Sequence, residues 1–213
     1  GDTETIVHGY EAWGTDVFDK LRGMFAIAIW DATKKRLVCA RDLFGIKPFY
    51  YQHDGNRLIY GSEIKAFLAH PGFEKRFNED RLPDYLSIEY LPGEETLFTG
   101  VYELRPGFSF LWREGRLSLE RYGKIRYRIR QDRTPAEWAA AIDKAFTGSV
   151  AAHRLADVEV GCFLSGGVDS TLTACKAAQQ QEGLQCFSVG YAEQAYSELP
   201  AAREAARELG VPC

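Results

Sequence analysis

The sequence has no apolar run that approaches the length of a membrane span, and no basic stretch followed by an apolar segment at its beginning. Its 26 basic and 30 acidic residues leave a net charge of −4, so no general attraction to nucleic acid or anionic membranes is expected. The five cysteines form no C-x-x-C pair, and the four histidines are isolated from them, which is against a metal centre. We therefore expect a cytoplasmic protein that acts on small molecules, with no nucleic-acid partner and no membrane partner.

The length of 213 residues is enough for two ordinary domains, each with its own core. The chain begins with Gly1 and enters a helical pattern at once. Near the other end, a helical pattern stops at Gly210 and only Val211-Pro212-Cys213 follows, where an α/β unit normally continues into its next strand. We therefore expect the sequence to be a fragment of a longer protein.

The first part of the chain has the patterns of antiparallel sheet. Phe25, Ile27 and Ile29 alternate with Ala26 and Ala28, which predicts a strand that buries its bulky face and is approached closely on the other. Two turn sequences, Asp54-Gly55 and Arg113-Glu114-Gly115-Arg116, predict hairpins. The expected strands cover 24–30, 36–40, 49–52, 57–60, 108–112 and 117–122. The expected helices cover 3–13, 63–69 and 78–90, and Asn78 is predicted to cap the last of them.

The second part of the chain follows a basic, aperiodic stretch. Residues 124–133 are interpreted as a linker, because a nucleic-acid grip would need more stacking side chains than Tyr127. Thr134-Pro135-Ala136-Glu137 is a capping box, and the apolar stripe behind it, from Trp138 to Val150, predicts a helix that faces a core. We then expect strand 158–164, helix 170–181, strand 185–189 and helix 198–209. This order predicts a parallel sheet with right-handed crossovers.

The loop Ser165-Gly166-Gly167-Val168-Asp169-Ser170 lies between a predicted strand and a predicted helix. Its glycines let backbone N–H groups approach an anion, its serines add hydroxyl donors, and the helix begins at the same place. Asp169 is expected to bind a cation that phosphates also hold, with magnesium as the first candidate. The loop lacks the lysine of a Walker A sequence. An ordinary tight strand-to-helix turn is the alternative interpretation.

This loop resembles the pyrophosphate-binding loop of the ATP pyrophosphatase group, whose members form AMP-linked intermediates. The preceding part is similar to the glutaminase domain of glutamine-hydrolysing asparagine synthetases. The matching segments are Arg22-Gly23-Met24-Phe25-Ala26, Arg41-Asp42-Leu43-Phe44-Gly45-Ile46-Lys47-Pro48-Phe49-Tyr50-Tyr51 and Gly61-Ser62-Glu63-Ile64-Lys65-Ala66. The match continues through Asp157-Val158-Glu159-Val160-Gly161, Phe187-Ser188-Val189-Gly190 and Ser197-Glu198-Leu199-Pro200-Ala201-Ala202-Arg203. The resemblance therefore extends over essentially the whole chain.

The resemblance implies an α+β glutaminase domain of the N-terminal-nucleophile type over 1–125 and an α/β synthetase domain of the ATP pyrophosphatase type over 126–213, both incomplete. Its implied reaction makes asparagine from aspartate and glutamine-derived ammonia, through β-aspartyl-AMP and release of pyrophosphate. The implied cofactors are ATP and Mg²⁺, and the implied small-molecule substrates are ATP, aspartate and glutamine. A homodimer of the whole protein is also compatible with the resemblance.

Residue by residue, the resemblance assigns ATP binding to Leu164, Ser165, Gly166, Gly167, Asp169, Ser170 and Val189. Asp169 is its candidate catalytic residue and magnesium ligand. Asp2 matches an aspartate that holds the α-amino group of glutamine, although a carboxylate favoured by the helix dipole explains its position nearly as well. No cysteine precedes Asp2, so the sequence as given lacks the glutaminase nucleophile and is expected to be inactive by itself.

Three alternatives remain open at this point. The first is a homologue that adenylates another carboxylate and closes a ring, such as a β-lactam or a peptide, or modifies a sugar or peptide. The second is a catalytically silent scaffold fragment. The third concerns the role of two charged segments, Arg-Asp-Leu-Phe-Gly and Gly-Ser-Glu. Buried structural pairing explains their charges as well as communication between domains does. We assign these two segments no catalytic role.

Overall fold

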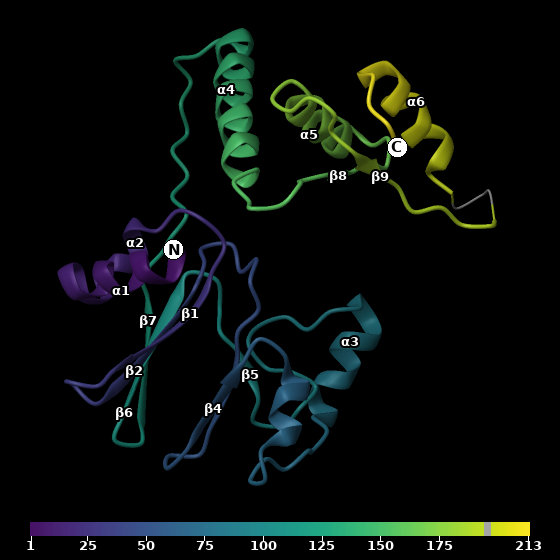
Figure 1. Ribbon diagram of the computed structural model, residues 1–213. Coiled ribbons are helices and arrows are strands. Elements are labelled where there is room, and N and C mark those ends of the chain that lie inside the picture. Colours follow the sequence, from purple (N-terminus) through teal and green to yellow (C-terminus); the bar gives the residue numbers. More distant parts are fainter. Residues whose placement is uncertain (194–196) are drawn as a thin grey trace. The chain divides into compact units, whose positions relative to one another are not determined.

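A boundary between Tyr127 and Arg128 divides the chain into two units, and the computed structural model describes residues 1–193 and 197–213. Figure 1 labels the helices and strands of both units. None of the helices within these ranges is both long and apolar enough to cross a membrane.

Unit 1, residues 1–127, combines helices with two antiparallel sheets of order β1-β2-β6-β7 and β4-β3-β5. Its strands are β1 (Ala26–Asp31), β2 (Arg36–Arg41), β3 (Tyr50–His53), β4 (Leu58–Gly61), β5 (Tyr102–Glu103), β6 (Phe108–Arg113) and β7 (Arg116–Arg121). Its helices are α1 (Asp2–Trp13), α2 (Val17–Lys20) and α3 (Leu82–Ile88), with 3₁₀ turns η1 (Gly14–Asp16), η2 (Ile64–Ala69) and η3 (Glu79–Arg81). The antiparallel sheets predicted for this part of the chain are confirmed.

The first sheet of unit 1 contributes to two cores, because successive side chains of a strand point to opposite faces. The core on the helix side consists of Val17, Phe18, Ile27, Val38 and Ala40. The core between the two sheets consists of Leu37, Cys39, Phe49, Tyr51, Leu104 and Phe110. On the predicted bulky face of β1, Ile27 is buried and Phe25 and Ile29 are partly buried against this core, whereas Ala26 and Ala28 on the other face are exposed. The predicted close approach to this alanine face is not found among the described residues.

A buried carboxylate fixes the loop that follows β2. The side chain of Asp42 is only 1% exposed and accepts four backbone N–H groups, from Phe25, Phe44, Ile46 and Lys47, at 3.0 to 3.2 Å. Burial acts to raise the pKa of Asp42, but these N–H donors outweigh it and hold the pKa below its ordinary value. Asp42 therefore serves the structure of this loop as an ionised acceptor.

The neighbouring Arg41 is buried as well, and it ties the same loop to β5. Its guanidinium donates to the carbonyl oxygens of Lys47, Leu104 and Gly45 at 2.7 to 2.8 Å and pairs with the Glu103 carboxylate at 2.7 Å. The structural interpretation of the Arg-Asp-Leu-Phe-Gly charges is thus supported. It does not extend to Glu63, whose side chain is 59% exposed and pairs with Lys65 at the surface.

Both predicted hairpin turns are confirmed. Asp54 accepts the N–H groups of Asn56 and Arg57 at 3.0 and 2.9 Å, and Gly55 has a φ of +89°. Glu114 and Gly115 both have positive φ, as a two-residue turn of the mirror-image type requires.

The predicted helix 78–90 is only partly correct. The chain forms η3 and then α3, which ends at Ile88 because Glu89 adopts a left-handed conformation. Asn78 does not cap it. Its side chain instead donates to the Thr96 carbonyl oxygen at 3.0 Å, a long-range partner that local sequence does not reveal. The predicted helix 63–69 is present as the 3₁₀ turn η2.

Unit 2, residues 128–213, contains a two-stranded parallel sheet and three helices within the described ranges. Its elements are α4 (Pro135–His153), β8 (Cys162–Phe163), α5 (Val168–Ala178), β9 (Cys186–Phe187) and α6 (Leu199–Leu209). Their core consists of Val150, Leu164, Ala174, Ala177, Leu184, Cys186, Ala202 and Ala206. The parallel sheet is confirmed in part.

The strands of this sheet are shorter than the predicted spans 158–164 and 185–189. Cys162 donates its N–H to Gln185 at 3.0 Å and Leu164 donates to Phe187 at 2.9 Å, but before Gly161 the chain has no strand partner among the described residues. Hydrophobicity predicts where a strand can form, whereas its length depends on its neighbour. The prediction that the whole apolar stripe of α4 faces a core was too broad. Val150 is buried, but Ile142 is 61% exposed.

The predicted capping box of α4 is confirmed and allows a first test. The Thr134 hydroxyl accepts the Glu137 N–H at 3.3 Å, and the Glu137 carboxylate accepts the Thr134 N–H at 2.8 Å. Thr134→Ala is expected to lower the free energy of unfolding of unit 2 by about 1 kcal/mol. Thr134→Ser, which keeps the hydroxyl, should restore most of it. Urea unfolding followed by circular dichroism measures both, and equal losses in the two variants would contradict the capping role.

Candidate functional site

The loop between β8 and α5 has the strand, turn and helix order that the sequence predicts. Leu164 is 1% exposed and anchors the end of the strand in the core. Gly166 has a φ of +83°, and Gly167 is the N-cap residue of α5. The loop therefore turns sharply and presents its backbone at the positive end of the helix dipole.

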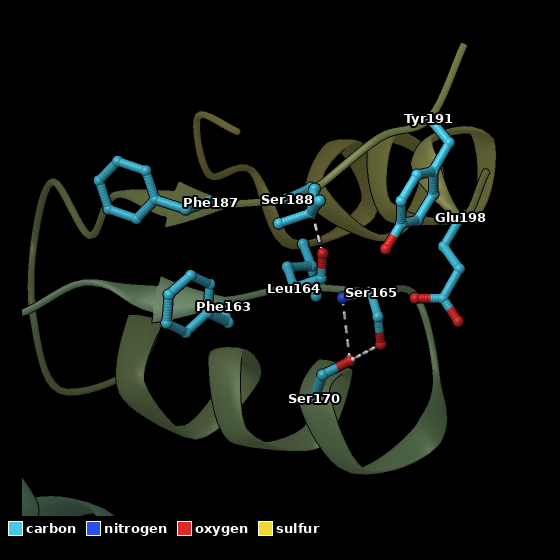
Figure 2. A pocket seen from close by; sticks show the side chains of 9 residues that line it. Phe163, Leu164, Ser165, Ser170, Phe187, Ser188, Tyr191 and Glu198 are labelled. Carbon is cyan, nitrogen blue, oxygen red and sulfur yellow. Dashed lines mark hydrogen bonds between the residues drawn. The ribbon is translucent and has the colours of Figure 1, made fainter. Parts of the chain in front are cut away.

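The two serines of the loop are hydrogen-bonded to each other. Ser165 Oγ lies 2.9 Å from Ser170 Oγ, and the Ser165 N–H donates to Ser170 Oγ at 3.2 Å. The Ser170 hydroxyl in turn contacts the Gly167 carbonyl oxygen at 3.2 Å. These bonds, drawn in part in Figure 2, join the first and last residues of the loop and hold the two hydroxyls together.

Gly166 is held against the first turn of α6. A Cβ placed on Gly166 would lie 2.5 Å from the carbonyl carbon of Ala201 and 2.6 Å from its Cβ. The absence of a side chain at Gly166 therefore serves the packing of the loop on α6. The loop sequence predicted a tight backbone here, but not that this contact would be with another helix.

A cavity of about 440 Å³ opens beside the loop, a volume in the range of small-molecule sites. It is lined by Phe163, Leu164, Ser165, Ser170, Phe187, Ser188, Val189, Tyr191 and Glu198. Figure 2 shows Phe163 and Phe187 at one end of the cavity, and Ser165 and Ser170 with the side chains of Tyr191 and Glu198 at the other. The cavity thus has an aromatic end and a polar end. The loops that follow β8 and β9 both contribute residues to this cavity.

The structure brings most of the predicted nucleotide-binding residues together. Leu164, Ser165, Ser170 and Val189 line the cavity, and Gly166 and Gly167 shape its loop. Asp169 is different: it stands in the first turn of α5, is exposed, and does not line the cavity. Its assigned role stays a prediction.

Five of the lining residues were not predicted as site residues: the aromatic Phe163 and Phe187, and the polar Ser188, Tyr191 and Glu198. Ser188 directly follows β9, where strand ends meet ligands in parallel sheets, and its hydroxyl donates to the Leu164 carbonyl oxygen. That position was a usable signal. Glu198 lies beyond a connection whose path does not follow from sequence, so nothing in the pattern indicated that it reaches the loop.

Asp2, the predicted glutamine-binding residue, lies in the first turn of α1. Its carboxylate accepts the Thr3 N–H at 2.7 Å, and the residue is exposed. This position suits a negative charge at a helix N-terminus and leaves the carboxylate accessible to a ligand. The structure therefore fits both interpretations of Asp2, as a glutamine-binding residue and as a charge that stabilises the start of α1.

The donor set near the loop fits magnesium only as an ion that arrives with a nucleotide. Within the described ranges, no three His, Cys, Asp or Glu side chains cluster so as to hold a metal. Magnesium in phosphate sites typically keeps several waters and takes one or two carboxylates plus the phosphates themselves. Of the carboxylates next to the loop in sequence or in space, Glu198 lines the cavity and Asp169 does not.

Two cysteines of unit 2 belong to its parallel sheet. Cys162 and Cys186 are in-register partners of the parallel sheet, and burial raises the pKa of both thiols. They are therefore protonated and unreactive near neutral pH. All five cysteines of the chain are free thiols.

Comparison with known proteins adds to this geometry. A curated Mycobacterium bovis protein, provisionally named asparagine synthetase (glutamine-hydrolyzing), is 38% identical over 99% of this chain and 33% of its own length. Two Bacillus subtilis proteins, asparagine synthetase (glutamine-hydrolyzing) 1 and 3, are 34% and 35% identical over 99% and 90% of this chain. The chain spans about a third of the length of these relatives.

Two family matches coincide with the two units. Residues 141–212 match the Asparagine synthase family. This range contains the Ser165–Ser170 loop and the residues that line the cavity. Residues 1–123 match the Glutamine amidotransferase domain family. Since this second match covers more than half of the sequence, the chain belongs to the glutamine amidotransferase domain family and continues into an asparagine synthase segment.

Proposed function

We propose that the protein containing this chain is an ATP-dependent ligase that forms asparagine from aspartate with ammonia from glutamine. Residues 1–125 would belong to its glutaminase domain and residues 126–213 to its synthetase domain. The observation that carries the proposal is the Ser165–Ser170 loop, which places two serine hydroxyls at the polar end of a 440 Å³ cavity, next to the N-terminus of α5. The names of the relatives support the amide-forming reaction.

The proposed chemistry has two steps at this cavity. A carboxylate oxygen of aspartate attacks the α-phosphorus of ATP, the bond to pyrophosphate breaks, and β-aspartyl-AMP forms. Ammonia then attacks the acyl carbon, the bond to AMP breaks, and asparagine leaves. The first step produces charge on the departing pyrophosphate, so it needs donors that face the β- and γ-phosphates.

The loop would supply these donors. Ser165 and Ser170 would hydrogen-bond the phosphate oxygens, and the N-terminus of α5 would add the favourable field of its dipole. The main chains of Leu164 and Val189 would meet the rest of the nucleotide. Asp169 would share a magnesium ion with the phosphates, and bound magnesium would neutralise part of their charge. Asp2 in unit 1 would hold the α-amino group of glutamine.

The setting of the reaction is part of the proposal. Five free thiols are typical of a reducing compartment such as the cytoplasm. Whether the whole protein forms a homodimer remains a prediction of the family resemblance.

Asp169→Asn tests the proposal in the natural full-length protein. The variant keeps the shape of the side chain but removes its charge, so release of pyrophosphate from ATP, aspartate and directly supplied ammonia should fall about 100-fold or more. Supplying ammonia removes any dependence on the glutaminase half. Phosphate release in a coupled assay with inorganic pyrophosphatase measures the rate.

Glu182→Gln is the matched control, because it also converts an exposed carboxylate of unit 2 to an amide and does not line the cavity. It should leave the rate unchanged. A folded Asp169→Asn variant with the wild-type rate would show that this loop does not serve adenylation and would favour a scaffold role.

A further inference from the structure

The backbone pairing between β8 and β9 stops where a side chain takes the place of a backbone donor. Leu164 donates its N–H to the Phe187 carbonyl oxygen at 2.9 Å. In a regular parallel ladder the Leu164 carbonyl oxygen would then accept the N–H of Val189. The Ser188 hydroxyl donates to that carbonyl oxygen instead, as Figure 2 shows. This explains why β9 ends at Phe187, although the sequence pattern predicts a strand over 185–189.

The Ser188 hydroxyl is held in this position by a second contact. Its oxygen lies 3.0 Å from Cys213 Sγ. The single hydroxyl proton is already used on Leu164, so the thiol is the donor of this contact. Leu164 is only 1% exposed, and a buried carbonyl oxygen without a partner is costly. The serine therefore satisfies an acceptor that the strand would otherwise have to satisfy with its own backbone.

This arrangement leaves the main chain of Val189 outside the ladder. Among the described residues its N–H donates to no carbonyl oxygen, and Val189 lines the cavity beside the Ser165–Ser170 loop. The next residue, Gly190, lies so close to α6 that a Cβ placed on it would be 2.6 Å from Leu199 Cγ. The main chain of Val189 is thus fixed on both sides, by the hydrogen bond of Ser188 and by the packing of Gly190.

We infer that Ser188 is a positioning residue that keeps the Val189 N–H available to the nucleotide. Its hydroxyl occupies the Leu164 carbonyl oxygen, so the Val189 N–H is left to donate to an acceptor atom of the ligand. The inference rests on the proposed function, in which the main chain of Val189 meets the nucleotide. It adds the side chain that prevents the sheet from using this donor itself.

Hydrogen exchange at the Val189 amide tests the structural part of the inference. It is measured on the natural full-length protein by mass spectrometry with fragmentation to single residues. In the wild type this amide should exchange rapidly, and ATP with magnesium should slow the exchange at least about tenfold. In Ser188→Ala the Leu164 carbonyl oxygen loses its partner and takes the Val189 N–H, so exchange should already be slow without nucleotide. A merely destabilised protein would exchange faster.

Nucleotide affinity tests the consequence for binding. In isothermal titration calorimetry with ATP and magnesium, Ser188→Ala should raise the dissociation constant about tenfold, as expected for the loss of one hydrogen bond. Ser188→Thr keeps the hydroxyl and should stay within about twofold of the wild type in both measurements. Ser149→Ala is the matched control, because it removes a hydroxyl from α4 that does not line the cavity. It should behave as the wild type.

Rapid exchange at Val189 in Ser188→Ala would overturn the inference and leave the proposed function standing. Slow exchange combined with unchanged affinity for ATP would also overturn it, because the nucleotide would then not use this donor. A wild type that binds no ATP would instead overturn the proposed function, and the role inferred for Ser188 with it.

Discussion

Gly166→Ala is expected to lower the rate of pyrophosphate release more than 100-fold and to destabilise unit 2 by about 2 to 4 kcal/mol. The backbone at Gly166 has a φ of +83°, which residues with a Cβ adopt only under strain. The new Cβ would also lie 2.5 Å from the main chain of Ala201. Since backbone cannot move aside as a flexible side chain does, the loop and α6 would have to separate.

Gly148→Ala provides the matched control for this substitution. Gly148 lies within α4, and a Cβ placed there meets no atom within 4 Å. This variant should be more stable by about 0.5 to 1 kcal/mol, because glycine is unfavourable inside a helix, and its activity should not change. Denaturant unfolding and the pyrophosphate assay report on both variants. Wild-type behaviour of Gly166→Ala would show that the contact with α6 is dispensable.

Asp42→Asn is expected to lower the free energy of unfolding of unit 1 by about 3 kcal/mol at neutral pH. The ionised carboxylate accepts four backbone N–H groups while almost fully buried. An asparagine side chain has only one acceptor oxygen, so its NH₂ group would face N–H donors. Thermal and denaturant unfolding of the natural protein, followed by a probe in unit 1, would measure the loss.

The effect of Asp42→Asn should also depend on pH. The N–H donors hold the pKa of Asp42 below its ordinary value in the folded chain, although burial acts in the opposite direction. The stabilisation is therefore fully present above the unfolded pKa, about 3.9, and is lost as pH falls through the folded pKa. The difference between wild type and Asp42→Asn should stay constant from about pH 5 to 8 and shrink below about pH 4.

Asp54→Asn separates this effect from that of an ordinary carboxylate. Asp54 also accepts backbone N–H groups and its pKa is also lowered, but it lies in an exposed hairpin turn. Its replacement should have a much smaller effect, because water can satisfy the freed donors. Equal effects of the two substitutions would show that burial of Asp42 does not matter.

The parts of the fold that sequence predicts are those controlled by neighbouring residues. The Asp54-Gly55 turn, the Thr134 capping box and the Gly210 helix stop depend on residues within one turn of each other, and all three are present. Asn78 failed as a cap because Thr96, eighteen positions away, provides the partner for its side chain. The predicted length of β8 was wrong for the same reason, because its neighbour β9 pairs with only two of its residues.

The candidate site shows the same division. The serines and glycines of the Ser165–Ser170 loop are adjacent in sequence, so the sequence alone predicts that they form one phosphate-binding loop. Glu198 lies 28 positions after Ser170 and reaches the cavity only because α6 packs on Gly166. Neither spacing nor periodicity indicates such a contact.

The hydrogen bonds between Ser165 and Ser170 have a consequence for kinetics. A loop that already closes on itself does not have to become ordered when a ligand arrives, so little of the interaction energy is lost in fixing it. Association should then occur in a single step at a rate that varies little among nucleotides. Discrimination between them would lie in how long each one stays bound.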